Sequence, residues 1–323
     1  MAEPIVGPFG PGGSVITVGT FDGLHRGHAA LLESLREAAH REGARAVVAT
    51  FHPHPLRVVR PHEAPQLLTT RTEKLELLSQ LGVDAVVLIA FDQQLASYAP
   101  EEFVKEILVA RLGARHLVIG YDHGFGRGRS GDATTLRALG AREGFTVDVV
   151  QPVIVAGAPV SSSRIRRALT TGDLAGAAAG LGRAYSLRGR VVRGDGRGRT
   201  LGFPTANLAL PDPSKLLPQE GIYAVRADVG GSLRDGVLHL GPRPTYVGAT
   251  ATVELHLFDF DEDLYGEDVG VRFCTRLRGV ERFAGPAALA AAIAADCTEA
   301  RRVLSEGAGA CGHGVTWLAS KAV

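Results

Sequence analysis

Two histidines of this sequence stand where they could bind a phosphate group. The segment 19–28, GTFDGLHRGH, follows the apolar run Val15–Gly19 and leads into a helical pattern over Gly27–Glu42. A helix N-terminus offers free backbone N–H donors and partial positive charge. His25 and His28 could donate hydrogen bonds to phosphoryl oxygens as charge builds in a transition state. Other interpretations are a histidine pair that only caps or packs, and an HxxH metal-ligand pair, for which no third ligand is suitably spaced nearby.

A second stretch combines glycines, arginines and small oxygen-bearing side chains. Residues 193–207 read RGDGRGRTLGFPTAN. A Gly/Arg-rich flap can fold over phosphates with its backbone N–H groups. Thr205 and Asn207 have neutral oxygens that could ligate Mg²⁺, and their spacing in an extended chain points both to the same side. An RNA-binding or disordered Gly/Arg segment is disfavoured, because the stretch is short and leads abruptly into an ordered proline motif.

A carboxylate lies on a later alternating segment, Thr252–Phe258. Glu254 shares a face with Thr252 and His256, because Val253 and Leu255 point the other way. A carboxylate within hydrogen-bond reach of an alcohol can take its proton during phosphoryl transfer. That face is either a polar site or plain solvent, and periodicity alone leaves both open.

Two further runs carry polar chemistry. Ser162 and Ser163 precede a helical stretch, which they could cap, or they could bind phosphate, and Arg166 follows one turn later as a candidate clamp for a triphosphate. The run from Gly120 to Asp132 has five glycines with Asp122, Arg127 and Arg129, and it follows an expected strand. We expect a flexible polar loop that takes part in a site. An ordinary solvated loop is disfavoured, because the run lies at the end of a strand.

The elements that position these residues change in kind near residue 185. Before it, short apolar strands alternate with helical patterns, which predicts a parallel α/β sheet with ligands beyond the C-terminal ends of its strands. The expected strands are 15–19, 46–51, 85–90, 116–120 and 146–150, and the expected helices are 27–42, 72–80, 100–112 and 132–143. After it, strands at 187–193, 222–229, 237–241, 252–258 and 269–275 predict a small antiparallel barrel, closed by a helix over 286–305.

Bulk composition narrows the class of protein. The chain has 323 residues, 45% of them apolar and 21% charged, which suits two globular domains and excludes a wholly disordered chain. A net charge of +1 gives no general attraction to nucleic acid or membrane. The N-terminal residues lack the features of a signal peptide, and no apolar stretch is long enough to span a membrane. The three cysteines form no CxxC pair, so we expect packed or exposed thiols, without a zinc site or disulfide, in a reducing cytoplasm.

The N-terminal half resembles the adenylyltransferase domain of bacterial bifunctional riboflavin kinase/FAD synthetases. The resemblance rests on GTFDGLHRGH, on TFHPHP at 50–55, on the run at 120–132 and on SSSRIR at 161–166. It implies that ATP is bound by Gly19, Phe21, Asp22, Gly23, His25, His28, Ser162, Ser163 and Arg166. It also implies that FMN is bound by Asp122, Phe125 and Arg129. This sequence departs from the family pattern at His52, His123 and Pro159.

The C-terminal half is similar to riboflavin kinases. GxxxGRxLGFPTAN matches at 194–207, and further matches are GIYA at 221–224, GPRPTY at 241–246, TVELH at 252–256 and DLYG at 263–266. The resemblance implies that Glu254 is the catalytic base and that Thr205 and Asn207 hold Mg²⁺. ATP and flavin would contact Gly194, Arg199, Gly202, Pro204, Thr205, Asn207 and Arg278.

Together the two resemblances imply an enzyme with riboflavin, FMN and ATP as substrates and FMN and FAD as products. Residues 1–183 would adenylylate FMN with release of pyrophosphate, residues 184–306 would phosphorylate riboflavin, and 307–323 would form a tail. Nucleic acid and membrane are not expected partners, and homo-oligomerisation stays open. Alternatives are a chain with one active half, a flavin sensor without turnover, and an HxGH transferase acting on another phosphate.

Overall fold

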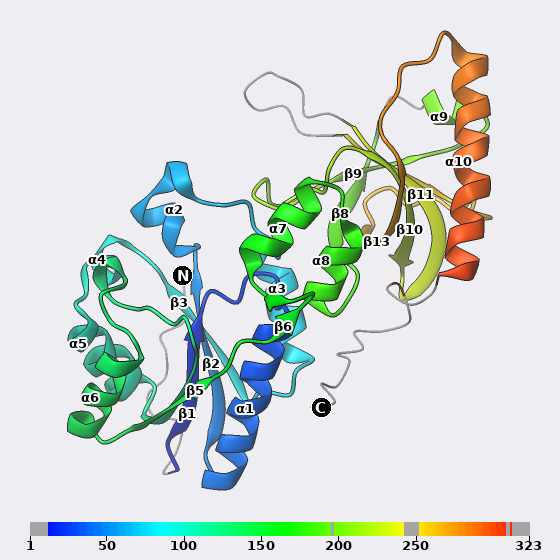
Figure 1. The fold of residues 1–323 in the computed structure, drawn as a ribbon. Coiled ribbons are helices and arrows are strands. Elements are labelled where there is room, and N and C mark those ends of the chain that lie inside the picture. The colour runs from blue at the N-terminus through cyan, green and yellow to red at the C-terminus, as the bar shows by residue number, and fades with distance from the viewer. Residues whose placement is uncertain (1–11, 195–196, 242–251, 308–310, 312–323) are drawn as a thin grey trace. The chain divides into compact units, whose positions relative to one another are not determined.

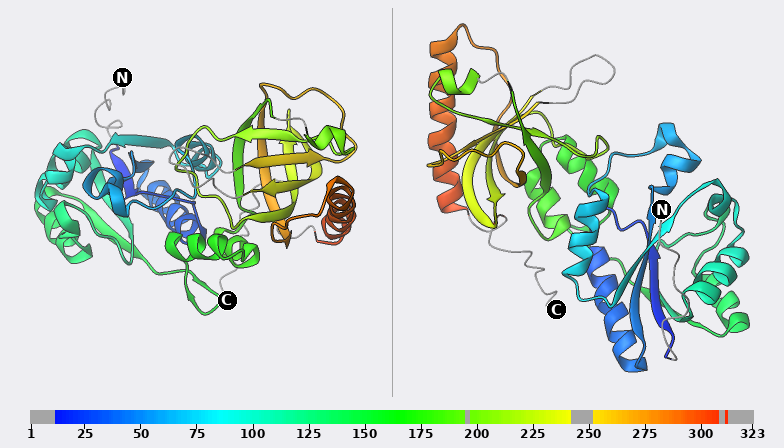
Figure 2. Two further views of the ribbon diagram at one scale, coloured as in Figure 1. Left: turned by 90° about the horizontal axis from the view of Figure 1, so that it is seen from above. Right: turned by 180° about the vertical axis from the view of Figure 1, so that it is seen from behind.

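A computed structural model describes residues 12–194, 197–241, 252–307 and 311 of the chain. These residues divide into two compact units, the first ending at Ser161 and the second beginning at Ser162 (Figures 1 and 2). The first contains a parallel sheet and the second a closed antiparallel barrel followed by a helix, which confirms the predicted fold class. Among the described residues, no helix is long and apolar enough to span a membrane.

The first unit is built on a five-stranded sheet in the order β3-β2-β1-β4-β5. Its strands are β1 (Ser14–Gly19), β2 (Arg45–His52), β3 (Ala85–Ala90), β4 (Ala114–Gly120) and β5 (Thr146–Val150). The order reverses between β1 and β4, and a ligand crevice lies at such a point in open α/β sheets. All five predicted strands are present. Helices cover both faces of the sheet, which explains why the strands are nearly all apolar (Figure 1).

The helices of this unit include the four that were predicted and two short ones, Pro55–Val59 and Gln93–Ser97, that were not. They are α1 (Arg26–Glu42), α2 (Pro55–Val59), α3 (Arg71–Ser79), α4 (Gln93–Ser97), α5 (Pro100–Glu102) and α6 (Ala133–Glu143). The helix predicted over 100–112 is α5 continued by a π-helical segment, Phe103–Arg111. Short 3₁₀ segments at Pro61–Glu63 and Arg127–Arg129 and a small hairpin of β6 (Ile154–Val155) and β7 (Ala158–Pro159) were not predicted.

The second unit is a barrel in the order β10-β11-β12-β9-β8-β13, with α10 packed against it. Its strands are β8 (Ser186–Val192), β9 (Ala206–Ala209), β10 (Gly221–Val229), β11 (Ser232–Leu240), β12 (Val253–Leu257) and β13 (Asp268–Arg278). Its helices are α7 (Ser162–Thr170), α8 (Leu174–Leu181), α9 (Arg197–Thr200) and α10 (Pro286–Glu306). Strand β9 was not predicted, because its four residues are too few to show an alternation of apolar and polar side chains.

Two expectations need adjustment at the ends of this unit. Ser162 and Ser163 do not precede α7 but are its first residues. Helices α7 and α8 group with the barrel, whereas the predicted boundary lies at 183/184; the limits 1–183, 184–306 and 307–323 stay a prediction. Most of the GPRPTY match at 241–246 and most of the 307–323 tail lie outside the described residues.

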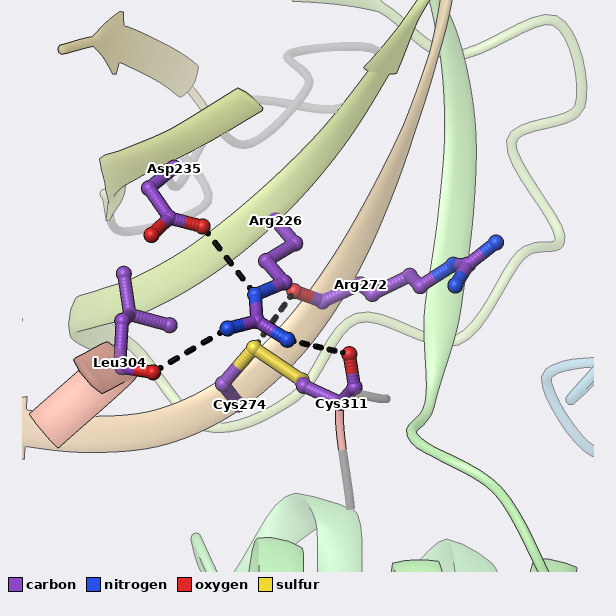
Figure 3. Close-up of polar contacts among 6 residues, drawn as sticks. All are labelled: Arg226, Asp235, Arg272, Cys274, Leu304 and Cys311. Carbon is purple, nitrogen blue, oxygen red and sulfur yellow. Dashed lines mark hydrogen bonds and ion pairs between the residues drawn. A yellow bond between two sulfur atoms is a disulfide. The ribbon is translucent and has the colours of Figure 1, made fainter. Parts of the chain in front are cut away.

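The expectation of unpaired cysteines is wrong for two of the three. Cys274 on β13 and Cys311 form a disulfide, with their Cα atoms 5.6 Å apart (Figure 3). Arg226 lies beside it, where its guanidinium donates to the carbonyls of Cys311 (2.8 Å) and Leu304 (3.1 Å). The pairing spans 37 residues and depends on where the chain returns after α10, which cysteine spacing does not reveal. Cys297 is free.

Candidate functional sites

The two histidines of the HxGH run lie together at the start of α1. His25 is the N-cap residue, and its Nδ1 accepts from the backbone N–H of His28 at 3.3 Å. The two rings are stacked, with centroids 3.7 Å apart and planes inclined by 13°. Because Nδ1 of His25 accepts, a neutral imidazole carries its proton on Nε2. A Cβ at Gly27 would lie 3.2 Å from the His25 ring and from Val160, so the glycine allows this packing.

The turn before α1 is held in an unusual backbone conformation. Phe21 (φ 48°) and Leu24 (φ 42°) have positive φ although neither is glycine, and a Cβ at Gly23 would meet Leu68 at 2.6 Å. The Asp22 carboxylate accepts the backbone N–H groups of Leu68 (3.1 Å) and Thr69 (3.0 Å), so it shapes the turn. Gly19 ends β1 beneath the Phe21 ring. Lys74, a buried cation whose Nζ donates to the Thr20 carbonyl before this turn, was not predicted. A lysine one helical turn before the buried Leu78 was the signal that could have indicated it.

The loop over residues 120–132, which was expected to be flexible and to bind FMN, is held together by several contacts. Phe125 pairs with Gly131 as a β-bridge, and a Cβ at Gly131 would lie 2.4 Å from the Phe125 ring. Arg129 donates to the backbone carbonyl of Asp122 at 2.9 Å. His123 stacks near Phe125, with ring centroids 5.8 Å apart. Burial, together with Arg129, lowers the pKa of His123 to about 4, while Asp122 opposes that shift, so the imidazole is neutral at neutral pH.

Ser162, Ser163 and Arg166 lie on α7, which belongs to the second unit. Ile165 and Leu169 form the buried face of this helix. The role of Ser162, Ser163 and Arg166 at the triphosphate stays a prediction.

In the barrel, three polar residues line up across neighbouring strands. Glu254 on β12 is paired with Asn207 on β9 and with His239 on β11. Residues directly opposite in antiparallel strands project from the same face. Val253 and Leu255, its neighbours, are 2% and 1% exposed and point into the barrel. His239 was not predicted, because only the strand register brings it beside Glu254.

The proline motif packs against His256, on the face of β12 that also carries Glu254. The ring Nδ1 of His256 lies 2.8 Å from the backbone oxygen of Pro204, and the Phe203 ring lies edge-on to His256. His256 thus has a structural contact, whereas Glu254, two residues before it, is half-buried beside Asn207 and His239, and its role stays a prediction.

The Gly/Arg segment approaches the two candidate Mg²⁺ ligands closely. A Cβ at Gly194 would lie 2.1 Å from Nδ2 and 2.8 Å from Oδ1 of Asn207, and a Cβ at Gly198 would lie 2.3 Å from the backbone oxygen of Phe203 and 3.0 Å from Oγ1 of Thr205. Gly202 has φ 86°, which favours glycine there. Arg199 is exposed on α9. Gly194 and Gly198 thus lie against the side chains of Asn207 and Thr205, whose neutral oxygens are the kind of donor that Mg²⁺ accepts.

Arg278 has a different set of contacts from those expected. Its guanidinium makes a two-point contact with Asp296 of α10 (2.8 and 2.7 Å) and donates to the carbonyl of Gly279 at 3.1 Å. Hydrogen bonding to Asp296 raises its pKa. The residue fastens α10 to β13, and a contact with flavin stays a prediction.

Comparisons with known proteins agree with both constellations. The sequence matches the family models described as FAD synthetase, over residues 10–164, and riboflavin kinase, over residues 181–304. A bifunctional riboflavin kinase/FMN adenylyltransferase of Escherichia coli (strain K12) is 39% identical over 90% of this chain and 92% of its own length. A protein of the same name from Pseudomonas fluorescens is 41% identical over 92% and 94%.

Among solved structures, one named as a macrolide-efflux protein from Streptococcus pneumoniae has a TM-score of 0.81 and 32% identity, covering 91% of this chain and 94% of that one. That name describes the other protein, and its likeness supports the two-unit fold along nearly the whole chain. The chain belongs to the family of bifunctional riboflavin kinase/FMN adenylyltransferases, with an FAD synthetase domain before a riboflavin kinase domain, and the predicted synthesis of FAD from riboflavin through FMN is confirmed.

Proposed function

We propose that His25 and His28 bind the phosphates of ATP during adenylyl transfer, supported by their stacking at the N-terminus of α1. The phosphate of FMN attacks the α-phosphorus of ATP, and pyrophosphate leaves. Imidazole N–H groups and the helix N-terminus stabilise the charge on the phosphoryl oxygens. No covalent enzyme intermediate is needed, because positioning and charge neutralisation carry the reaction.

The remaining predicted residues bind the rest of the substrates for adenylyl transfer. Gly19, Phe21, Asp22 and Gly23 shape the ATP pocket, and Ser162, Ser163 and Arg166 assist the triphosphate. Asp122, Phe125 and Arg129 hold FMN, and the stacked, neutral His123 suits an uncharged aromatic ring system.

In the kinase half, Glu254 is the general base, which its pairing with Asn207 supports. It takes the proton of the primary ribityl alcohol as that oxygen attacks the γ-phosphate of ATP and ADP leaves. The neutral oxygens of Thr205 and Asn207, which lie beside Gly198 and Gly194, would hold Mg²⁺, which when bound would neutralise phosphate charge. Gly194, Arg199, Gly202 and Pro204 cover the ATP and flavin, and Arg278 supports the flavin end through α10.

Several finer features complete the proposal. The enzyme acts in the cytoplasm on riboflavin, FMN and ATP, without nucleic acid or membrane as partners, and homo-oligomerisation is compatible with it. A protein with only one activity, or a sensor without turnover, is disfavoured. Both halves keep groups that binding alone does not require, namely His25 and His28 in the first and Glu254 in the second.

The test is a chromatographic product assay with riboflavin, ATP and Mg²⁺. Wild type should form FMN and then FAD. His28→Ala should stop at FMN, and Glu254→Ala should form FAD only when FMN is supplied. The exposed residues His40 and Glu262 provide matched controls, His40→Ala and Glu262→Ala, which should behave as wild type. If wild type binds flavin but forms neither FMN nor FAD, the protein is a flavin sensor rather than an enzyme.

A further inference from the structure

Lys74 is a buried lysine to which the proposed mechanism gives no role. It lies on α3 and is 8% exposed. Its Nζ donates to the carbonyl of Thr20 (3.1 Å), the hydroxyl of Thr50 (3.2 Å) and the carbonyl of Phe51 (3.4 Å). Burying an ammonium group is costly unless it is hydrogen-bonded, and here all three acceptors belong to the C-terminal ends of β1 and β2.

The Thr20 carbonyl is a point where two donors meet. The hydroxyl of Thr50, itself fully buried, also lies within hydrogen-bond distance of that carbonyl, at 3.2 Å. Lys74 and Thr50 therefore hold the peptide that leads into the turn before α1. Burial lowers the pKa of Lys74, and the Asp22 carboxylate of the same turn counteracts that shift.

The segment before α3 holds the other side of the same turn. Leu68 and Thr69 donate their backbone N–H groups to Asp22, and Gly23 donates to the Thr69 hydroxyl at 3.0 Å. Residues in sparsely populated backbone regions persist only when their surroundings determine them. The positive φ values within the turn are thus maintained by residues 68–74 as one unit.

From Thr20 the contacts continue directly to the histidines. The buried Phe21 follows Thr20, and its ring lies edge-on to His28 with centroids 5.2 Å apart. His28 in turn stacks on His25. A displacement of the Thr20 peptide would therefore move the Phe21 ring, which lies against the ring of His28.

We propose that Lys74 is a positioning residue for FMN adenylylation, holding the Thr20 carbonyl so that Phe21 keeps His28 and His25 in place for ATP. The proposal rests on the role of the histidines given above. A cation that merely fastened α3 to the sheet would affect the stability of the first unit and leave turnover by folded molecules unchanged.

The test compares Lys74→Met with Lys105→Met, which alters an exposed lysine of the same unit. FMN adenylylation is measured as kcat and KM with FMN supplied, riboflavin phosphorylation is measured on the same samples, and thermal unfolding reports the folded fraction. A misplacement of about 1 Å can cost about 100-fold in rate. We expect kcat for adenylylation to fall on that order in Lys74→Met, with little change in KM for ATP, and kinase activity to match Lys105→Met.

A second pair of variants protects the test against misfolding. Thr50→Val removes the hydroxyl from the network with nearly the same volume, whereas Thr50→Ser keeps it. Adenylylation should fall in Thr50→Val and be largely retained in Thr50→Ser. An unchanged kcat in folded Lys74→Met, or equal rates in the two Thr50 variants, overturns the role of Lys74. Full adenylylation by His28→Ala would instead refute the proposed histidine site.

Discussion

Glu254 on β12 lies directly opposite Asn207 on β9, so the proposed base and a proposed Mg²⁺ ligand share one face of the barrel. The two residues are separated by 47 positions in the sequence, and the antiparallel register alone makes them neighbours. If Glu254 is the base, this pairing places it beside a residue proposed to hold Mg²⁺, an arrangement that phosphoryl transfer to an alcohol requires.

Replacing Glu254 by glutamine should reduce kinase turnover by about 10²–10⁴-fold, the usual contribution of a general base. Glutamine has a similar shape but accepts no proton, so KM for riboflavin should change little. The measurement is FMN formation from riboflavin, with FAD formation from supplied FMN as the internal control. Kinase turnover equal to that of Glu262→Gln would show that Glu254 is not the base.

Gly27→Ala should impair adenylylation without affecting the kinase. A Cβ there would lie 3.2 Å from the His25 ring and from Val160, so one of them must shift by a few tenths of an ångström. We expect the loss in kcat for FAD formation to exceed the loss in thermal stability. Gly285→Ala is the matched control, because a Cβ at that position has open space around it. Normal FAD formation by Gly27→Ala would mean that the exact position of His25 is unimportant.

Removing the disulfide should destabilise the second unit. A cross-link that closes a loop of this length restricts the unfolded chain by about 4 kcal/mol in the chain-entropy model. The variant with both Cys274→Ser and Cys311→Ser should lower the free energy of unfolding by an amount of that order, measured by denaturant titration. Dithiothreitol should destabilise wild type similarly and leave the double variant unchanged, and Cys297→Ser should still respond to it. A wild type that ignores dithiothreitol would contradict the cross-link.

Acid should destabilise the first unit partly through His123. Its pKa is about 4 in the fold and about 6.5 in an unfolded chain, so the unfolded state binds the proton more readily. The contribution to stability is therefore full above about pH 6.5 and is lost as the pH falls toward 4. His123→Phe should lose less thermal stability than wild type between pH 7 and 4.5. The variant His62→Phe, at an exposed position, should follow wild type.

Much of the architecture was predictable because it depends on short-range patterns. Side chains alternate between two faces with a period of two in β10 and return to one face with a period of 3.6 in α1, and such patterns can be recognised within a few residues. The C-cap of α1, Gly43 in the left-handed conformation, is equally local. The HxGH and GFPTAN runs are likewise continuous, so the kinds of chemistry and the family could be recognised before the fold was known.

The sequence by itself determined the two classes of domain, the phosphate-directed motifs and the identity of most proposed site residues. The tertiary structure alone decided that Glu254 faces Asn207 and His239, that Lys74 supports the turn before His25, and that Cys274 pairs with Cys311. The physical reason is the range of the interactions. Helical and strand periodicity are set by neighbouring residues, whereas strand register, a buried cation and a disulfide depend on how distant segments pack.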